Sequence, residues 1–448
     1  MKRQHSSLLL VLGAALGSLL LSTQLTFAQG SLTPPGAPAP TMKTLAQIEP
    51  RTPISSLPFN IKQPGSYYLT TNLMANPGGI TIWTNGVTLD LMGFELSGEG
   101  GSSIGIGLLA NVDNICIRNG IVSGWLYDGI NLRTSTNCLL EDLRVSRNGG
   151  HGVLVGDATV ISRCAASQNR GDGIVGGVGC SVLNSTAYTN GTNGIRLFAS
   201  GVVRDCVVLR NGRAGLFTAQ NSTLTDCSAG YNGWVGLYVG PGSAVTGCSA
   251  YANKSHGITD FADALGTPGL SVANCAATYN DGNGFFLVNG SAVKHCLAKG
   301  NLGHGFETYY GSTITDCSAN ENKGTGIKLE VQCVLDRCAA SGNGTNGIQL
   351  VKQCTVTACT ANANKQHGIY AAGNYNRIDG NTVSENLGDG ISLLFSAAKN
   401  IVVRNFSSDN VGYEYRVPGL PGQFGGPNVV GAVTSDATAA NAWANFSP

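Results

Sequence analysis

Residues 203–239 read VRDCVVLRNGRAGLFTAQNSTLTDCSAGYNGWVGLYV and contain one pattern twice, 21 positions apart. A cysteine, an asparagine and a glycine occupy the same places in both copies. A repeat of this length is typical of solenoid proteins, in which each repeat forms one coil that packs only against its neighbours. The sequence therefore predicts a repeat protein rather than a set of separate globular domains.

Three rows of residues extend this pattern along most of the chain, and most steps are 21 residues long. The first row consists of glycines that precede a branched or aromatic residue: Gly129, Gly152, Gly173, Gly194, Gly215, Gly236, Gly257, Gly284, Gly305, Gly326, Gly347, Gly368 and Gly390. The second row is Asn148, Asn169, Asn190, Asn211, Asn232, Asn253, Asn280, Asn301, Asn322, Asn343, Asn364, Asn386 and Asn410. The third row is Cys164, Ser185, Cys206, Cys227, Cys248, Cys275, Cys296, Cys317, Cys338 and Cys359, followed by Asn381 and Asn405.

Each unit reads roughly V-x-x-C-x-A-x-x-N-x-x-x-G-I-x-L and holds two or three short alternating stretches, with no window long enough for a helix. A leucine-rich repeat is the main rival, because residues 224–232 imitate its core motif. The Gly-Ile-x-Leu half of each unit argues against it, since a horseshoe needs a helix or an extended segment there. A left-handed hexapeptide helix also fits less well, because the period shows no six-residue beat.

The predicted fold is all-β: a right-handed parallel β-helix solenoid with about 21 residues per coil and roughly 13 regular coils. Asparagine suits a turn row because it tolerates left-handed backbone and because its amide can bond to its copies in the coils above and below. The apolar residue after each glycine, and the apolar residue two positions later, should point inward and form the core.

The asparagine row, the coil length and the segments Gly79–Ile82 and Val87–Leu91 carry a family resemblance. The chain resembles right-handed parallel β-helix proteins of the pectin-lyase-like superfamily, in particular exported bacterial repeat proteins whose activity is unassigned. The resemblance covers residues 45 to 446. It implies that any activity lies on the outer face of one sheet or on loops inserted between coils, because the inward positions are filled by the core.

The N-terminus predicts export. Lys2 and Arg3 precede an apolar run from Leu8 to Leu21, and small residues stand at the cleavage positions before and at Ala28. The predicted organisation is a signal peptide at 1–28, a Pro-rich linker at 29–40, an N-terminal cap at 41–75, the β-helix at 76–411 and a C-terminal cap or tail at 412–448. An uncleaved membrane anchor is the alternative. The apolar run is short for a bilayer span, so we expect a secreted, periplasmic or cell-surface protein with no membrane contact after cleavage.

Charge excludes one class of partner. Charged residues make up 12% of the chain and the net charge is +1. Nucleic-acid domains carry a clustered excess of Lys and Arg, so we expect no nucleic-acid partner. Residues 118–213 hold ten Arg against six acidic residues, whereas residues 214–448 are weakly acidic. An anionic glycan would prefer the first part, although the difference is small.

The 14 cysteines would ordinarily indicate disulfides in an exported protein. Eight of them, from Cys206 to Cys359, occupy one slot in successive coils, where β-carbons lie about 4.8 Å apart, beyond the usual disulfide separation. We therefore expect buried free thiols that pack as small hydrophobic side chains. Neither this spacing nor that of Cys333 and Cys354 matches a zinc site, and we expect no metal and no cofactor.

The slot just before each glycine is the first candidate for chemistry. Four of the six histidines lie in this slot, and Asp128, His151 and Asp172 should stack there in consecutive coils. Such a cluster could perform acid/base work on a sugar. The simpler interpretation is a turn slot that favours Asp, Asn and His for their backbone tolerance. Residues 150–156 resemble the histidine motif of polygalacturonases, but the other motifs of those enzymes are missing, so familiar pectinolysis is not expected.

The single long step, from Gly257 to Gly284, is the second candidate, because a lone inserted loop often builds a site. It suggests a catalytic set of His256, Asp260, Asp263 and Glu307. Outward residues two positions after the glycines would supply substrate contacts: Tyr238, Phe286, Phe217, Arg196 and Lys328. Aromatic faces bordered by polar groups suit sugar rings, but a solvated strand face with incidental aromatics explains them equally well.

Two function classes follow. One is an exported protein that binds an extracellular polysaccharide, with cleavage or epimerisation by a lyase, hydrolase or epimerase as its catalytic form. The other is a non-catalytic structural or adhesive surface solenoid. Copper delivery, as in periplasmic β-helix proteins of nitrous oxide reductase maturation, has only the histidine row in its favour. The oligomeric state stays open.

Overall fold

The computed structural model describes residues 49–75, 77–99, 103–260, 268–288, 290–417, 428–435 and 442–447. Contacts divide the chain into two units, Met1–Pro50 and Arg51–Pro448, and all strands belong to the second. The predicted signal peptide, the linker and the first part of the predicted cap lie outside the described residues. The described part consists of strands and turns and contains no helix.

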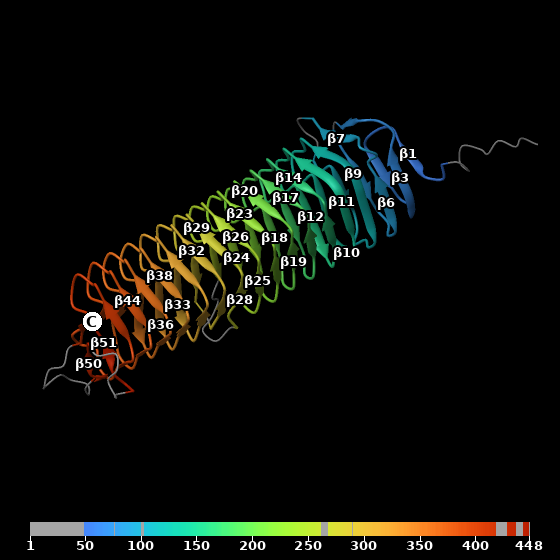
Figure 1. The fold of residues 1–448 in the computed structure, drawn as a ribbon. Helices are drawn as coiled ribbons and strands as arrows, with labels where there is room; N and C mark the ends of the chain where they lie inside the picture. Colours follow the sequence, from blue (N-terminus) through green and yellow to red (C-terminus); the bar gives the residue numbers. More distant parts are fainter. Residues whose placement is uncertain are drawn as a thin grey trace, which may run out of the picture. The chain divides into compact units, whose positions relative to one another are not determined.

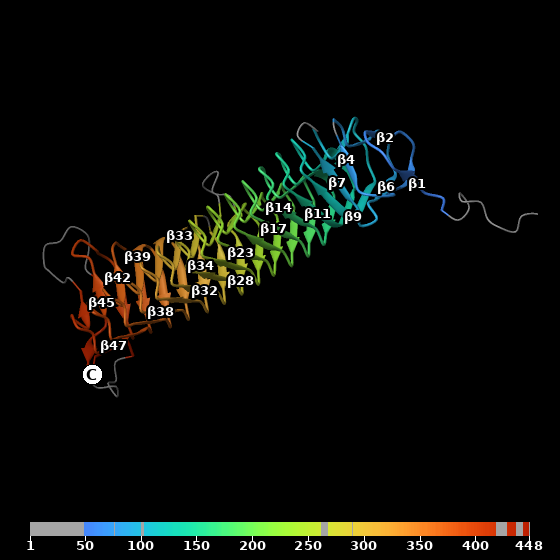
Figure 2. The ribbon, with the colours of Figure 1, turned by 90° about the horizontal axis from the view of Figure 1, so that it is seen from above.

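Each regular coil contributes three short strands. In one coil these are β15 (Ile174–Gly176), β16 (Ser181–Leu183) and β17 (Thr186–Tyr188). The next coil repeats all three 21 residues later, and each new strand pairs in parallel with its counterpart. The coils therefore stack in chain order and form three parallel ladders, called here the first, second and third strand rows (Figure 1). Figure 2 shows the same stack after a quarter turn.

The first strand row follows the glycine row of the sequence. It consists of β2 (Phe59–Ile61), β5 (Ile80–Ile82), β8 (Ile106–Leu108), β10 (Ile130–Thr136), β12 (Val153–Asp157), β15, β18 (Ile195–Leu197), β21 (Leu216–Thr218), β24 (Leu237–Val239), β27 (Ile258–Asp260), β30 (Phe285–Leu287), β33 (Phe306–Tyr310), β36 (Ile327–Val331), β39 (Ile348–Lys352), β42 (Ile369–Ala371), β45 (Ile391–Leu393) and β48 (Tyr415–Arg416).

The other two rows belong to one sheet, because β9 (Ile115–Ser123) and β11 (Leu139–Ser146) are long enough to span both. The second strand row is β1 (Thr52–Ile54), β3 (Gly65–Leu69), β6 (Val87–Asp90), β13 (Val160–Ser162), β16, β19 (Val202–Arg204), β22 (Thr223–Thr225), β25 (Ala244–Thr246), β28 (Ser271–Ala273), β31 (Ala292–Lys294), β34 (Thr313–Thr315), β37 (Val334–Asp336), β40 (Thr355–Thr357), β43 (Arg377–Asp379), β46 (Ile401–Val403) and β49 (Val429–Val430). The third strand row is β4 (Leu73–Ala75), β7 (Glu95–Gly98), β14 (Ala165–Ser167), β17, β20 (Val207–Leu209), β23 (Ser228–Gly230), β26 (Ser249–Tyr251), β29 (Ala276–Thr278), β32 (Leu297–Lys299), β35 (Ser318–Asn320), β38 (Ala339–Ser341), β41 (Thr360–Asn362), β44 (Thr382–Ser384), β47 (Phe406–Ser408) and β51 (Asn445–Phe446), with β50 (Val433–Thr434) beside it.

The predicted all-β parallel solenoid is confirmed. About 16 coils stack in the part of the chain that the structure describes. Pairing begins at β1 and β3, well before residue 76, where the repeat pattern places the start of the helix. In the first coil Pro58 stands before β2 where later coils have glycine, so the glycine row does not reveal this coil.

The core lies inside the coils, as the alternating pattern predicts. Ile195 and Leu197 of β18 are fully buried, whereas Arg196 between them is only partly covered. The same alternation recurs in the next coils of the first strand row. Inside the stack, the rings of Phe285 and Phe306 lie parallel with their centroids 4.5 Å apart. Hydrophobic burial between coils therefore joins each coil to the next.

The asparagine row forms a continuous hydrogen-bonded ladder. Asn211 Nδ2 donates to Asn232 Oδ1 at 3.1 Å, and the same Oδ1 also accepts the backbone N–H of Asn211 at 3.1 Å. The prediction that these asparagines adopt left-handed backbone is wrong. The residue before each ladder asparagine has the positive φ instead, for example Arg147 at 57° and Gln168 at 56°.

The glycine row exists because the ladder needs space. A β-carbon at Gly194 would lie 2.7 Å from Asn211 Nδ2 and 2.7 Å from the carbonyl oxygen of Gly215, both in the next coil. Contacts this short are repulsive, so a larger residue would push neighbouring coils apart. The regular glycine spacing therefore follows from the buried asparagine amides.

The cysteine row is a second ladder of the same kind. All fourteen cysteines are free thiols, which agrees with the predicted absence of disulfides. Their role differs from simple hydrophobic packing, because Cys317 Sγ accepts the backbone N–H of Cys296 at 3.3 Å. Ser185 Oγ accepts the N–H of Cys164 at 3.1 Å in the same slot. Burial raises the pKa of the Cys164 thiol to about 11, so it stays protonated at neutral pH.

Candidate functional site

The slot before each glycine, called here the acceptor row, forms a third ladder. Asp128 Oδ1 accepts the backbone N–H of His151 at 2.7 Å, and His151 Nδ1 accepts that of Asp172 at 2.9 Å. Asn193 Oδ1 accepts the N–H of Ala214 at 3.2 Å. Asp, Asn and His all carry an acceptor atom one bond beyond Cγ, so they are interchangeable here. This geometry favours the turn interpretation of the histidine-rich slot.

The ladder also determines the protonation state of its histidines. Nδ1 of His256 accepts the N–H of Asn283 at 3.0 Å, and Nδ1 of His304 accepts that of Thr325 at 2.9 Å. An accepting Nδ1 carries no proton, so these rings are neutral and hold their proton on Nε2. Burial lowers the pKa of His256, and the nearby Glu307 carboxylate opposes this shift.

Asp128, His151 and Asp172 stack in consecutive coils, and the side chain of each accepts the backbone N–H of the equivalent residue in the next coil. Asp172 is the most constrained member. Its Oδ1 accepts hydrogen bonds from the Thr192 hydroxyl and the Asn193 backbone N–H, and its Oδ2 lies 2.7 Å from Arg196 Nε. Burial raises its pKa, but the Thr192 hydrogen bond and the Arg196 charge outweigh burial and hold it below the usual value. Asp172 therefore stays ionised at neutral pH.

Four of the residues expected near the long loop lie in one cluster: His256, Phe286, Glu307 and Lys328. The His256 ring stacks on Phe286 with centroids 4.8 Å apart. Asn283, which donates its N–H to His256, also donates from Nδ2 to Glu307 Oε2 at 2.6 Å. Lys328 Nζ lies 2.8 Å from Glu307 Oε1, and Glu307 is almost fully buried. The result is a buried polar network beside an aromatic ring.

Asp260 does not belong to that outward cluster. It lies in register with the inward Val239, it is buried, and its Oδ1 accepts the N–H of Val288 at 2.8 Å. Side chains alternate along a strand, so Asp260 lies on the opposite side of β27 from Thr259. The expected pairing of His256 with Asp260 is therefore corrected. Asp263 lies outside the described residues.

A hollow with aromatic walls lies on the first strand row, among β18, β21 and β24. It measures about 450 Å³ and is lined by Asn193, Arg196, Leu197, Phe198, Arg213, Phe217, Trp234 and Tyr238. The centroids of Phe217 and Tyr238 lie 5.2 Å apart, and those of Trp234 and Tyr238 lie 5.0 Å apart. We call this site the aromatic hollow. It contains three of the five substrate contacts expected from the sequence: Arg196, Phe217 and Tyr238.

Sequence reasoning missed Arg213 and Trp234, although a signal for both exists. They occupy the slot two positions after a ladder asparagine, which holds Gly, Ser, Thr or Gln in the other regular coils. In the same two coils the acceptor row carries the apolar Ala214 and Val235. The structural ladder is thus interrupted where the aromatic hollow lies. Two coils give up a stabilising hydrogen bond there, as is common at functional sites.

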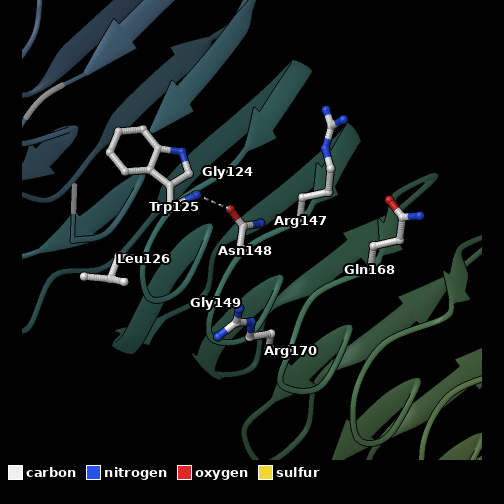
Figure 3. A pocket seen from close by; sticks show the side chains of 8 residues that line it. All are labelled: Gly124, Trp125, Leu126, Arg147, Asn148, Gly149, Gln168 and Arg170. Atoms are coloured by element: carbon white, nitrogen blue, oxygen red, sulfur yellow. Dashed lines mark hydrogen bonds between the residues drawn. The ribbon is translucent and has the colours of Figure 1, made fainter. Parts of the chain in front are cut away.

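A second hollow lies closer to the N-terminus, at the turn that follows the third strand row. It measures about 380 Å³ and is lined by Gly124, Trp125, Leu126, Arg147, Asn148, Gly149, Gln168 and Arg170 (Figure 3). The Trp125 backbone N–H donates to Asn148 Oδ1 at 3.1 Å, so Trp125 occupies the slot of a ladder asparagine. Within the described residues, no carboxylate lies within ion-pair distance of Arg147 or Arg170.

Comparison with known proteins identifies the family. The family described as a right handed beta helix region matches residues 104–264, 217–315 and 303–407. The chain belongs to this right-handed β-helix family. A sequence search among curated proteins finds no match.

The solved structures to which this chain is similar share little of its sequence. The A-module of the mannuronan C-5 epimerase AlgE4 of Azotobacter vinelandii is 15% identical, with 82% of this chain and 91% of that chain covered and a TM-score of 0.29. The catalytic unit of a GH87 alpha-1,3-glucanase of Streptomyces thermodiastaticus is 15% identical, with 68% and 58% covered and a TM-score of 0.35. The Dettilon tailspike protein gp208 is 13% identical, with 85% and 62% covered and a TM-score of 0.27.

Two further observations concern ligands and membranes. Among the described residues, no group of three His, Cys, Asp or Glu side chains could hold a metal ion. In the same part of the chain, no helix is long and apolar enough to cross a membrane.

Proposed function

We propose that this protein binds an extracellular polysaccharide and that the aromatic hollow is its binding site. The observation that carries the proposal is a group of three rings on the outer face of the first strand row, in which Tyr238 contacts both Phe217 and Trp234. Sugar rings present flat C–H faces that pack on aromatic rings. The apolar N-terminal run of the sequence supports export, which would bring the site into contact with extracellular glycans.

Polar groups at the rim of the hollow support the same ligand class. Arg213 has no carboxylate within ion-pair distance among the described residues, so its guanidinium can donate to a ligand. Arg196 is held by Asp172 and lies with its guanidinium 5.9 Å from the centroid of the Phe198 ring. Fixed donors beside aromatic faces fit the hydroxyls and ring oxygens of a sugar.

The proposal concerns binding rather than bond cleavage or epimerisation. Three acid/base candidates of the first strand row, His151, Asp172 and His256, already serve the acceptor row, and Asp172 also holds Arg196. A general acid must carry a proton at the working pH, whereas the contacts of Asp172 keep it ionised. Asp172 therefore positions the Arg196 guanidinium at the rim of the hollow.

The test combines a polysaccharide panel with two substitutions. Trp234→Ala and Tyr238→Ala should each weaken binding of the best glycan by at least about tenfold, which corresponds to about 1.4 kcal/mol for one lost stacking contact. Phe395→Ala is the matched control, because Phe395 is an exposed aromatic residue far along the chain. Isothermal titration calorimetry gives the affinities, and circular dichroism verifies the fold.

The same panel separates the alternatives. Assays for reducing ends and for unsaturated products should stay negative, and a positive result would overturn the restriction to binding. Phe286→Ala tests whether the surface extends to the network of His256, Glu307 and Lys328. If no glycan binds the wild-type protein, the proposal fails and the structural or adhesive solenoid is the better description.

A further inference from the structure

A line of tyrosine and arginine side chains follows the end of the third strand row and shares no residue with the lining of the aromatic hollow. Tyr188 and Tyr251 end β17 and β26, and Arg210 and Tyr231 directly follow β20 and β23. Arg210 Nη1 donates to the Tyr188 hydroxyl at 3.1 Å and lies with its Cζ 5.8 Å from the centroid of the Tyr231 ring. The rings of Tyr231 and Tyr251 meet edge to face at 5.3 Å. Four consecutive coils thus form one contact chain.

A glycine makes room for this line. A β-carbon at Gly230, in the slot equivalent to Tyr188 and Tyr251, would clash with the Tyr251 ring. The Tyr251 ring therefore lies flat over backbone, while Tyr231 stays 54% exposed. Nothing in the coil repeat requires glycine or tyrosine in that slot, because the other coils carry Ser, Leu, Thr, Lys or Asn there. The glycine at position 230 therefore lets Tyr251 pack against the neighbouring coil and leaves the Tyr231 ring exposed beside it.

The second hollow lies at the N-terminal end of the same line. Arg147 and Gln168 occupy the slot that holds Arg210 and Tyr231 in later coils, and Figure 3 shows both side chains extending from successive turns. Arg170 extends from the same turn as Gln168, and all three line the hollow. The hollow and the tyrosine line therefore form one continuous edge, which we call the arginine–tyrosine edge.

Charge along this edge is mainly positive. The slots of Tyr188 and Arg147 contain no acidic residue from Ser146 to Tyr279, and the slot of Arg170 contains one acidic residue from Gly149 to Asp281, namely Asp281, which pairs with Lys254 at the far end of the edge. Arg147 and Arg170 have no carboxylate within ion-pair distance among the described residues, and Arg210 contacts tyrosines only. Six steps of about 4.8 Å separate Arg147 from Tyr279, so the edge is about 29 Å long.

We propose that the arginine–tyrosine edge binds a linear acidic polysaccharide that runs along the stacking direction. The guanidinium groups would pair with carboxylates in the two-pronged geometry that arginine favours, and the tyrosine rings would contact sugar faces. This site is separate from the aromatic hollow. The proposal shares the ligand class of the proposed function and adds a second surface and the charge of the glycan.

The experiment uses the full chain carrying Trp234→Ala and Tyr238→Ala, so that the aromatic hollow no longer contributes. Oligogalacturonates of increasing length are the probes, with neutral cello-oligosaccharides for comparison. Affinity for oligogalacturonates should rise with length until the chain spans the edge, and it should fall with added salt. The triple substitution Arg147→Gln, Arg170→Gln and Arg210→Gln should lower that affinity at least tenfold.

Two controls keep the result specific. Lys365→Gln removes a positive charge from the slot of Arg170 in a distant coil, and it should leave binding within twofold. Tyr231→Ala should weaken binding without changing the salt dependence. Unchanged affinity in the triple variant, or equal affinity for neutral oligosaccharides, would overturn this proposal. Loss of all oligogalacturonate binding in the Trp234→Ala, Tyr238→Ala variant would also overturn it. If the aromatic hollow binds no glycan, the experiment still tests the arginine–tyrosine edge, because this variant already lacks the hollow.

Discussion

At the scale of single residues, one requirement explains most of the repeat pattern. Each turn slot needs a side-chain atom that accepts the backbone N–H of the equivalent residue one coil earlier or later. Asn232 Oδ1 does this in the asparagine row, Cys317 Sγ in the cysteine row and His151 Nδ1 in the acceptor row. Chemically different residues can therefore share one slot. A histidine or aspartate in the acceptor row is thus explained by the backbone hydrogen bond and is weak support for catalysis.

The histidines make this requirement dependent on pH. Protonation of His256 at Nδ1 would remove the acceptor for Asn283 N–H, and burial already lowers the pKa of this ring below 6.5. Because the folded-state pKa lies below the unfolded one, the stabilisation is fully present above about pH 6.5. It declines as pH falls from there towards the lowered folded-state pKa.

We therefore expect His256→Asn to reduce the acid sensitivity of the fold. Asparagine keeps the acceptor, as Asn193 does in the same row, but it does not titrate. Urea unfolding at pH 7.5 and pH 5 should show a smaller loss of free energy of unfolding for the variant than for the wild type. A larger loss in the variant would contradict the ladder account of this histidine.

At the scale of the elements, the strand rows could be predicted but the backbone of the turns could not. Alternating apolar residues after each glycine predicted the buried positions of the first strand row, such as Ile195 and Leu197. The left-handed residue could not be located, because the side chain that needs the turn, Asn148, differs from the residue that bends, Arg147. The expected pairing of Asp260 with His256 was wrong for a similar reason. The repeat pattern does not show which way the last residue before an insertion faces.

The cysteine row offers a test at this scale. Cys317→Ser should change the free energy of unfolding by less than about 1 kcal/mol, because Ser185 accepts the same backbone N–H in this slot. Cys317→Ala leaves the buried N–H of Cys296 without its acceptor and should cost about 1–3 kcal/mol. Chemical unfolding of both variants measures the difference, and equal costs would mean that the thiols act only by packing.

At the scale of the whole Arg51–Pro448 unit, stability comes from contacts between neighbouring coils. A central coil is bonded on both sides, whereas β1 pairs only with β3. Repeat arrays of this kind open from their ends.

Hydrogen exchange followed by mass spectrometry should therefore give a graded pattern. We expect the slowest exchange in the coils around β18 to β30, where the three strand rows and the asparagine ladder continue in both directions, and faster exchange towards β1 and β47. The aromatic hollow lies within the central coils, so ligand binding should slow exchange there with little change at the ends. Equal exchange rates along the whole unit would contradict the claim that stability comes from contacts between neighbouring coils and that the unit opens from its ends.

The sequence by itself determined the coil, because a buried amide ladder, a glycine row and an alternating core each impose the same spacing on the chain. It also pointed to Arg196, Phe217 and Tyr238, whose outward positions follow from that alternation. Only the tertiary structure decided that Arg213 and Trp234 close the hollow, and that Tyr188 meets Arg210 on a different edge. Those contacts join residues from different coils and different slots, and their meeting depends on how the turns project side chains, which no single repeat encodes.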